Sequence, residues 1–200
     1  MNLNFASDNT GPAHPQVMEA VLRANDRAAM PYGNDPVTEA AVAAVRAAFE
    51  APEAEIAFVA TGTAANALAL SCLVRPFESV FCSRVAHIEE DECAAPEFYM
   101  GGAKLTLVDE TDGKIDPDDF TAKLSAAMDR GVHGAQPAAL SLTQITERGA
   151  AYSLDEIGKQ TALAHDAGLA THLDGARFAN ACATLGCSPA EMTWKAGIDT

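Results

Sequence analysis

The segment 172–177 holds the residues best suited to chemistry, an aspartate and an arginine on either side of a glycine turn. Asp174 ends an apolar stretch predicted to be a buried strand, and Gly175 breaks that stretch where a helix can begin. Open α/β sheets hold their ligands at the carboxyl ends of their strands. A carboxylate there can stabilise a protonated ring nitrogen, and Arg177 can bind a substrate carboxylate. An aspartate that caps a helix beside a surface arginine would give the same pattern.

A second candidate site is the segment Thr61-Gly62-Thr63-Ala64-Ala65-Asn66, which follows a predicted strand over 56–60. Gly62 permits a tight turn, and the helix behind it would present free N–H groups and the positive end of its dipole. The Thr63 hydroxyl adds a donor, so the segment can bind a phosphate group. It is neither a Walker loop nor a G-x-G-x-x-G motif, and an ordinary strand–turn–helix junction is the alternative.

The third feature is His87, which follows a predicted strand and precedes four acidic residues at 89–92. An imidazole can stack on an aromatic cofactor or move a proton near neutral pH. Successive acids are typical of a solvated helix amino terminus, because their charge suits the helix dipole, so we interpret 89–92 as structural. A metal site built from His87 and nearby carboxylates is the alternative.

The elements that must position these groups follow from apolar segments that alternate with longer, alanine-rich ones. We predict strands over 56–60, 79–83, 104–108, 138–143 and 169–174, and helices over 14–28, 35–49, 63–73, 117–130, 153–167 and 176–185. Ser153 and Glu156 fit a capping box, and Gly168 suits a helix end. Strands that are apolar throughout and separated by helices predict an α/β fold, a three-layer α/β/α arrangement with a mostly parallel sheet. The three motifs would then converge at one edge.

Composition sets broad limits on the fold and its partners. The chain has 200 residues, is 48% hydrophobic and 20% charged, and can bury one good-sized core. Its net charge of −15 argues against nucleic acid and anionic membranes as partners. The five cysteines form no C-x-x-C pair, which favours reduced thiols. With neither a secretory signal nor a membrane-spanning stretch visible, we expect a cytoplasmic protein.

Together these segments resemble the low-specificity L-threonine aldolases, a family in the aspartate-aminotransferase-like class (fold type I) of pyridoxal-phosphate enzymes. The resemblance rests on the order and spacing of segments 5–10, 32–36, 61–66, 86–88, 139–144 and 173–180. It implies the pyridoxal-phosphate-dependent transferase large-domain fold. It also implies an aldehyde-lyase that cleaves L-threonine, L-allo-threonine and related β-hydroxy-α-amino acids to glycine and an aldehyde.

The resemblance implies a pyridoxal 5′-phosphate site and no metal ligand. Gly62 and Thr63 match the phosphate-binding positions of the family. His87 matches the histidine stacked on the pyridine ring, and Asp174 matches the partner of the pyridine nitrogen. His87 and Asp174 are therefore expected to be catalytic as well as cofactor-binding.

Four further residues match positions around the amino-acid substrate. Arg177 and Ser7 match two ligands of the substrate carboxylate, and Tyr32 lies in a loop that often lines a neighbouring subunit's pocket. His133 aligns with a second catalytic histidine near the substrate hydroxyl, with a surface histidine in the loop 131–136 as the alternative.

The resemblance also implies a domain organisation. Residues 1–30 would form an amino-terminal arm and helix, and residues 31–200 the cofactor-binding large domain, which would be incomplete. In the family the Schiff-base lysine lies in a Ser-Phe-Gly-x-Thr-Lys-like segment, expected just beyond Thr200, with a small domain after it. Lys195 precedes the expected strand and is not given that role. We expect an amino-terminal portion of a homo-oligomer, a dimer or tetramer with shared active sites.

Three alternatives remain open at this point. A β-eliminating lyase or an aminotransferase of the same fold type would break Cα–H rather than Cα–Cβ. An inert cofactor-binding fragment is the second alternative. The third is a metal hydrolase that uses His87, Glu89, His172 and Asp174, although we interpret His172 as a packed supporting residue.

Overall fold

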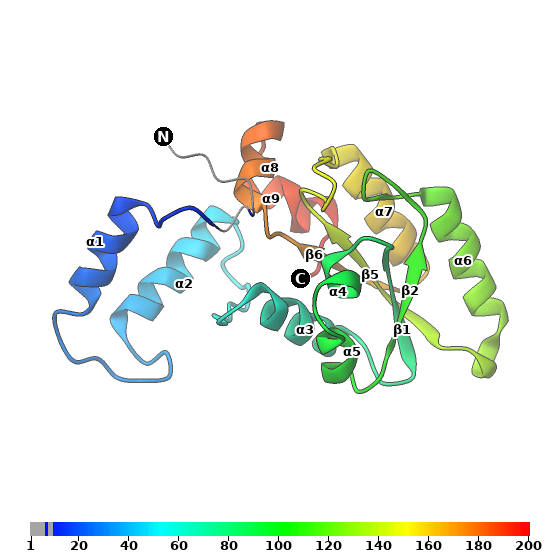
Figure 1. Ribbon diagram of the computed structural model, residues 1–200, viewed down its shortest axis with the longest axis horizontal. Helices are drawn as coiled ribbons and strands as arrows, with labels where there is room; N and C mark the ends of the chain where they lie inside the picture. Colours follow the sequence, from blue (N-terminus) through cyan, green and yellow to red (C-terminus); the bar gives the residue numbers. More distant parts are fainter. Residues whose placement is uncertain (1–6, 8–9) are drawn as a thin grey trace.

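A parallel sheet of four strands forms the centre of the computed structural model, which describes residue 7 and residues 10–200. The register of its ladders pairs Thr143 with Asp174 and Ser83 with Val108. The carboxyl ends of the strands therefore meet along one edge of the sheet (Figure 1). The strand order is β2 (Lys104–Val108), β1 (Glu78–Ser83), β5 (Gln136–Thr143) and β6 (Ala170–Asp174).

Helices cover both faces of the sheet and give the three layers that the sequence predicts (Figure 1). On one face, Leu70 packs in a core cluster with Val80 of β1. On the other face, Phe120 and Ile157 pack with Leu140 of β5. The first face is covered by α3 (Gly62–Leu73), α4 (His87–Glu90) and α5 (Ala95–Tyr99), and the second by α6 (Pro117–Asp129) and α7 (Leu154–Asp166).

The remaining elements lie around this core. Figure 1 shows α1 and α2 together at one end of the molecule, away from the sheet. No helix in residues 10–200 is long and apolar enough to cross a membrane. These elements are α1 (Pro15–Ala24), α2 (Pro36–Ala48), α8 (Phe178–Leu185), α9 (Pro189–Met192), the 3-10 turns η2 (Gly131–His133) and η3 (Trp194–Ala196), and a hairpin of β3 (Glu110–Thr111) and β4 (Lys114–Ile115).

The strand predicted over 56–60 is wrong. The segment is irregular, and the side chains of Phe58 and Val59 are 59% and 41% exposed. A strand needs a neighbour for its main-chain hydrogen bonds, and none of the described strands pairs with this segment. The outer edge of β6 instead bonds to the end of the chain, where Leu173 N–H donates to the Thr200 carbonyl.

The predicted helix signals of α7 are confirmed. The Ser153 hydroxyl accepts from Glu156 N–H, and the Glu156 carboxylate accepts from Ser153 N–H, which forms the capping box. At the other end, Gly168 takes a φ of 77°, the left-handed conformation that favours glycine after a helix. Both ends of α7 are therefore set by its own sequence.

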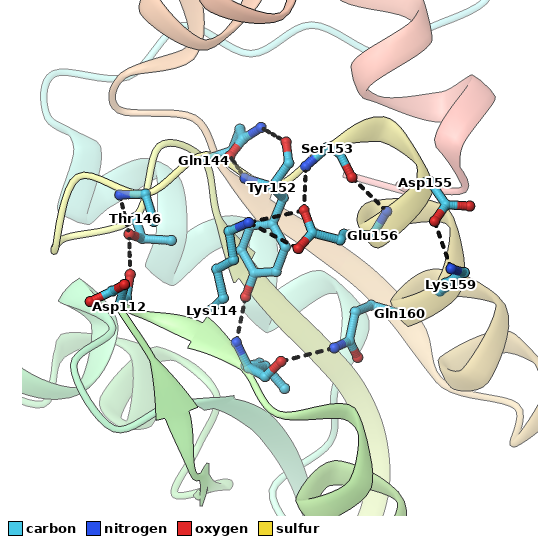
Figure 2. A network of polar contacts seen from close by, with 12 residues as sticks. Asp112, Lys114, Gln144, Thr146, Tyr152, Ser153, Asp155, Glu156, Lys159 and Gln160 are labelled. Carbon is cyan, nitrogen blue, oxygen red and sulfur yellow. Dashed lines mark hydrogen bonds and ion pairs between the residues drawn. The ribbon is translucent and has the colours of Figure 1, made fainter.

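The loop between β5 and α7 is held by buried polar contacts (Figure 2). The Gln144 amide donates to the Tyr152 carbonyl at 2.8 Å and accepts from Tyr152 N–H at 3.0 Å. The Tyr152 hydroxyl accepts from Ile115 N–H, which ties the loop to β4. The Thr146 hydroxyl donates to the Asp112 carbonyl at the β3–β4 turn. These contacts fix the loop that continues from the carboxyl end of β5.

Candidate functional site

Asp174 lies at the carboxyl end of β6 and is 8% exposed. Its Oδ1 accepts from Ala176 N–H at 3.0 Å, which closes a tight turn directly after the strand. A Cβ on Gly175 would lie 3.2 Å from Cβ of Phe178, so this turn leaves little room for a side chain. Oδ2 accepts from the Asn66 amide at 2.9 Å. Both oxygens are therefore held in place at the sheet edge.

The first turn of α3 faces the same region. Thr61 caps the helix, because its hydroxyl accepts from Ala64 N–H at 3.1 Å. The first N–H groups of any helix lack partners within the helix and form an anion-binding end. Thr63 is half-buried in this turn, and a cavity of about 230 Å³ lies beside it, bounded on the far side by Tyr99. Asn66 lies one turn further along α3, so the phosphate motif and the Asp174 partner share one helix.

His87 begins α4 and is held at two points. Its main-chain N–H donates to Glu147 Oε1 at 2.8 Å, and its ring Nδ1 hydrogen-bonds to Glu92 Oε1, also at 2.8 Å. Its side chain is 44% exposed, which leaves part of the ring available to a ligand. The hydrogen bond that Glu92 accepts from the ring raises the pKa of His87 above its ordinary value, against the effect of burial, and the charges of Asp174 and Asp91 add to the rise.

A continuous network joins these groups. The Asn66 amide nitrogen donates to Glu92 Oε1 at 2.7 Å as well as to Asp174 Oδ2. On the opposite side of His87, Glu147 also accepts from the Thr143 hydroxyl at 2.9 Å. Side chains from α3, β5, β6 and the segments around α4 therefore meet at the carboxyl edge of the sheet.

Sequence reasoning missed the partners of His87. The interpretation of the acids at 89–92 as solvated fits Glu89, which is exposed, but is wrong for Glu92, which is 3% exposed. Helix α4 ends at Glu90, and the chain then turns sharply through Cys93 and Ala94, both with positive φ. This turn directs Glu92 inward. Asn66 belongs to the segment 61–66, but its sequence position indicated no role for it. Glu147 lies in none of the predicted motifs.

The other predicted residues take separate positions. Arg177 is half-buried at the start of α8, three residues after Asp174 in the chain. Ser7 is exposed, and its carbonyl accepts from the Thr10 hydroxyl. Of the predicted motif 5–10, residues 5, 6, 8 and 9 lie outside the described residues.

Tyr32 and His133 do not join Asp174 within this chain. Tyr32 is 96% exposed in the turn between α1 and α2. His133 is exposed in η2, which precedes the amino end of β5, whereas Asp174 pairs with the carboxyl end of that strand. The length of β5 separates the two ends by about 23 Å, from a rise of about 3.3 Å per residue. Within one subunit, His133 and Asp174 therefore lie at opposite ends of β5.

His172 is buried on β6, and its Nδ1 lies 2.9 Å from the Ser141 hydroxyl. Burial lowers the pKa of His172 to about 4, against a small opposing effect from Asp174. The imidazole is therefore neutral and packed at pH 7. Across the described residues, no group of three or more His, Cys, Asp or Glu side chains is arranged to hold a metal ion.

Comparisons with known proteins identify the family of this chain. The sequence matches the beta-eliminating lyase family over residues 4–200. It is 44% identical over 195 residues to the low specificity L-threonine aldolase of Pseudomonas sp. (strain NCIMB 10558), covering 98% of this chain and 56% of that protein. It is 30% identical to the protein of that name from Saccharomyces cerevisiae, covering 92% of this chain and 46% of the relative. The chain thus spans about half the length of these relatives.

Solved structures share the fold. A threonine aldolase of Leishmania major superposes with a TM-score of 0.85 at 28% identity, covering 92% of this chain and 53% of the other. A putative L-allo-threonine aldolase of Listeria monocytogenes superposes with a TM-score of 0.70 at 18% identity, covering 92% of this chain and 49% of the other. The second likeness concerns the fold alone.

Proposed function

We propose, because the chain belongs to the beta-eliminating lyase family, that the full-length protein cleaves β-hydroxy-α-amino acids with pyridoxal 5′-phosphate. L-Threonine and L-allo-threonine would give glycine and acetaldehyde. The observation that carries this proposal is the hydrogen-bonded network of Asp174, Asn66, Glu92 and His87 at the sheet edge. Its support is the 44% identity to low specificity L-threonine aldolases.

The residues present fit this cofactor. A carboxylate that is 8% exposed and aimed by two hydrogen bonds suits a cationic ring nitrogen. The first turn of α3, which begins at Gly62 and has Thr63 beside a cavity, suits a phosphate group. His87, with part of its ring exposed, suits stacking on the pyridine ring. When bound, pyridoxal phosphate supplies an electron sink for the electron pair left at Cα when the Cα–Cβ bond breaks.

The chain's own residues would bind, orient and move protons. Asp174 would keep the proton on the ring nitrogen. Arg177, together with Ser7, would hold the substrate carboxylate and so set which bond at Cα is aligned for cleavage. A base takes the β-hydroxyl proton as the aldehyde leaves, and a proton returned to Cα completes glycine. His87 is linked to Asp174 by hydrogen bonds that run through Glu92 and Asn66.

We further propose that residues 31–200 belong to the cofactor-binding large domain, with residues 1–30 as an arm and helix. The protein would be a cytoplasmic homo-oligomer, a dimer or tetramer with shared sites. Free cysteines support a reducing compartment. Exposed apolar side chains on and after α1, including Leu22 and Met30 at 70% and 66%, support burial against another subunit.

A second candidate is β-elimination, which the name of the matched family favours. That reaction breaks Cα–H and leaves a keto acid and ammonia rather than glycine. The test is to incubate the full-length protein with pyridoxal phosphate and L-threonine, and to quantify glycine, acetaldehyde and keto acid. We expect glycine and acetaldehyde in equal amounts. A keto acid as the main product would assign the second reaction, and no product would contradict both.

A further inference from the structure

Glu92 is a buried carboxylate to which the proposed reaction gives no direct role. Its side chain has no exposed surface, and its Oε1 serves both the Asn66 amide and His87 Nδ1. Its Oε2 is buried without a hydrogen-bond partner in the described part of the chain. A buried acceptor without a partner is destabilising, so the fold keeps this carboxylate in spite of its effect on stability.

The carboxylate determines where His87 carries its proton. An ionised carboxylate only accepts hydrogen bonds, so the 2.8 Å contact requires Nδ1 to be the donor. In the neutral ring the hydrogen then lies on Nδ1, and Nε2 is the atom that gains or loses the second proton.

Asn66 prevents the carboxylate from reorienting. Its amide nitrogen has two hydrogens, and the two acceptors are Glu92 Oε1 at 2.7 Å and Asp174 Oδ2 at 2.9 Å. The Asn66 amide thereby connects Glu92, which orients His87, to Asp174, the proposed partner of the ring nitrogen.

We propose that Glu92 is a positioning residue that fixes His87 as the Nδ1–H tautomer and makes Nε2 the atom that exchanges a proton with the substrate hydroxyl. The exchange with substrate rests on the proposed function, whereas the tautomer does not. Asn66 acts as a second positioning residue, because it holds Glu92 and Asp174 in a fixed relation.

Four acidic groups from separate parts of the fold surround His87. Glu92 and Asp91 follow α4, Asp174 ends β6, and Glu147 accepts the main-chain N–H of His87 from the loop after β5. Glu92 has the largest influence on the imidazole, because it alone bonds to the ring. A change at Glu92 is therefore separable from a general change in negative charge.

The test compares Glu92→Gln with Glu90→Gln in the full-length protein. Both remove one negative charge from the same segment, but Glu90 is exposed. Ring nitrogen NMR of histidine-labelled protein, assigned with His87→Asn, reports the tautomer and the pKa without added substrate. In Glu92→Gln we expect a mixed tautomer and a lowered pKa of His87, because an amide can donate to Nδ1 as well as accept from it.

Activity is the second measurement. We expect kcat of Glu92→Gln on L-threonine to fall at least about tenfold with a smaller change in KM, by analogy with the loss of the hydrogen-bond partners of metal-ligating histidines. Glu90→Gln is expected to match the wild type in both measurements. Wild-type His87 with the hydrogen on Nε2 overturns the proposal, and so does a Glu92→Gln protein with an unchanged tautomer. An Nδ1–H wild type that does not cleave threonine would leave the tautomer intact and contradict the proposed function.

Discussion

At the scale of single residues, the environments of His87 and His172 have opposite effects on protonation. His87 is held by a carboxylate that favours its cationic form, whereas His172 is packed against Ser141 and remains neutral. The start of α4 therefore carries a titratable histidine, and β6 carries a neutral one. Only the first is suited to proton transfer.

We predict that His172 makes the fold less stable in mild acid. Burial lowers its pKa from 6.5 to about 4, so the unfolded chain binds a proton that the folded chain does not. The stability that depends on a neutral His172 is fully present above about pH 6.5 and is lost as the pH falls towards 4. Between pH 7.5 and pH 5 the free energy of unfolding should fall by about 2 kcal/mol. Urea unfolding of wild type and His172→Gln at both pH values would measure the difference.

The sign is opposite for His87. Because the pKa of His87 is raised in the folded state, protonation of this residue stabilises the fold at pH values below its pKa in the unfolded chain. This stabilisation is lost as the pH rises through the pKa of the folded state. The two histidines are therefore distinguished by NMR titration of their Cε1–H signals. A His172 signal that titrates near 6.5 would contradict the buried, neutral assignment.

At the scale of elements, the β3–β4 hairpin supports the loop that carries Glu147. A Cβ on Gly113 would lie 2.7 Å from Cβ of Thr146, and Gly113 has a φ of +81°. Thr146 in turn holds the hairpin through the Asp112 carbonyl (Figure 2). The hairpin and the loop after β5 are therefore in direct contact at a position where only glycine fits.

Gly113→Ala is predicted to destabilise the protein and to disturb His87. The matched control is Gly102→Ala, because Gly102 also has a positive φ but nothing within 4 Å of its Cβ position. The control should lose about 1 kcal/mol of unfolding free energy from backbone strain. Gly113→Ala should lose about 1–3 kcal/mol more from overpacking, measured by urea unfolding. Equal losses would show that the hairpin does not press on the loop.

The sequence predicted long elements better than short ones. The strands at 79–83 and 104–108 have the predicted bounds within one residue, since each contributes apolar residues to the core, Val80 and Phe81 in the first and Leu105 and Val108 in the second. The segment 56–60 is apolar throughout but has no paired neighbour among the described strands. Elements as short as β3 and α4 have no periodicity that a sequence could show.

The same distinction applies to the site. His87 and Asp174 were predicted because each follows a strand, and neighbouring parallel strands end at one edge. Glu92 and Asn66 were not, because their contacts join residues 26 and 108 positions apart in the chain. Local sequence shows where a chemical group is attached, whereas its partners depend on how the layers pack.

At the scale of the whole molecule, the proposed homo-oligomer is the arrangement in which residues from two subunits could share one site. His133 and Asp174 lie at opposite ends of β5 in one subunit, and Tyr32 is almost fully exposed. In a symmetric dimer, one patch on each subunit contacts the partner twice, so two equivalent shared sites can form.

Mixing two inactive variants tests shared sites. If Asp174→Ala and His133→Ala disrupt different subunits' contributions to one site, refolded mixtures contain hybrids with one intact site. A dimer with random pairing should then recover about one quarter of wild-type activity. No recovery, with hybrids verified by mass spectrometry, would confine each site to one chain, and a His133→Ala protein that is active by itself would deny His133 a role.

The central claim is that Asp174 anchors a cofactor-dependent aldol cleavage site at the carboxyl edge of the sheet. The most direct measurement is glycine formation from L-threonine by full-length wild type, Asp174→Ala and the control Asp166→Ala, in which an exposed aspartate at the end of α7 is removed. We predict that Asp174→Ala lowers kcat/KM by at least about 10²-fold, since it removes the buried carboxylate that would keep the ring nitrogen of the cofactor protonated. The control should keep wild-type activity. A folded Asp174→Ala enzyme with near-wild-type glycine formation would contradict the claim.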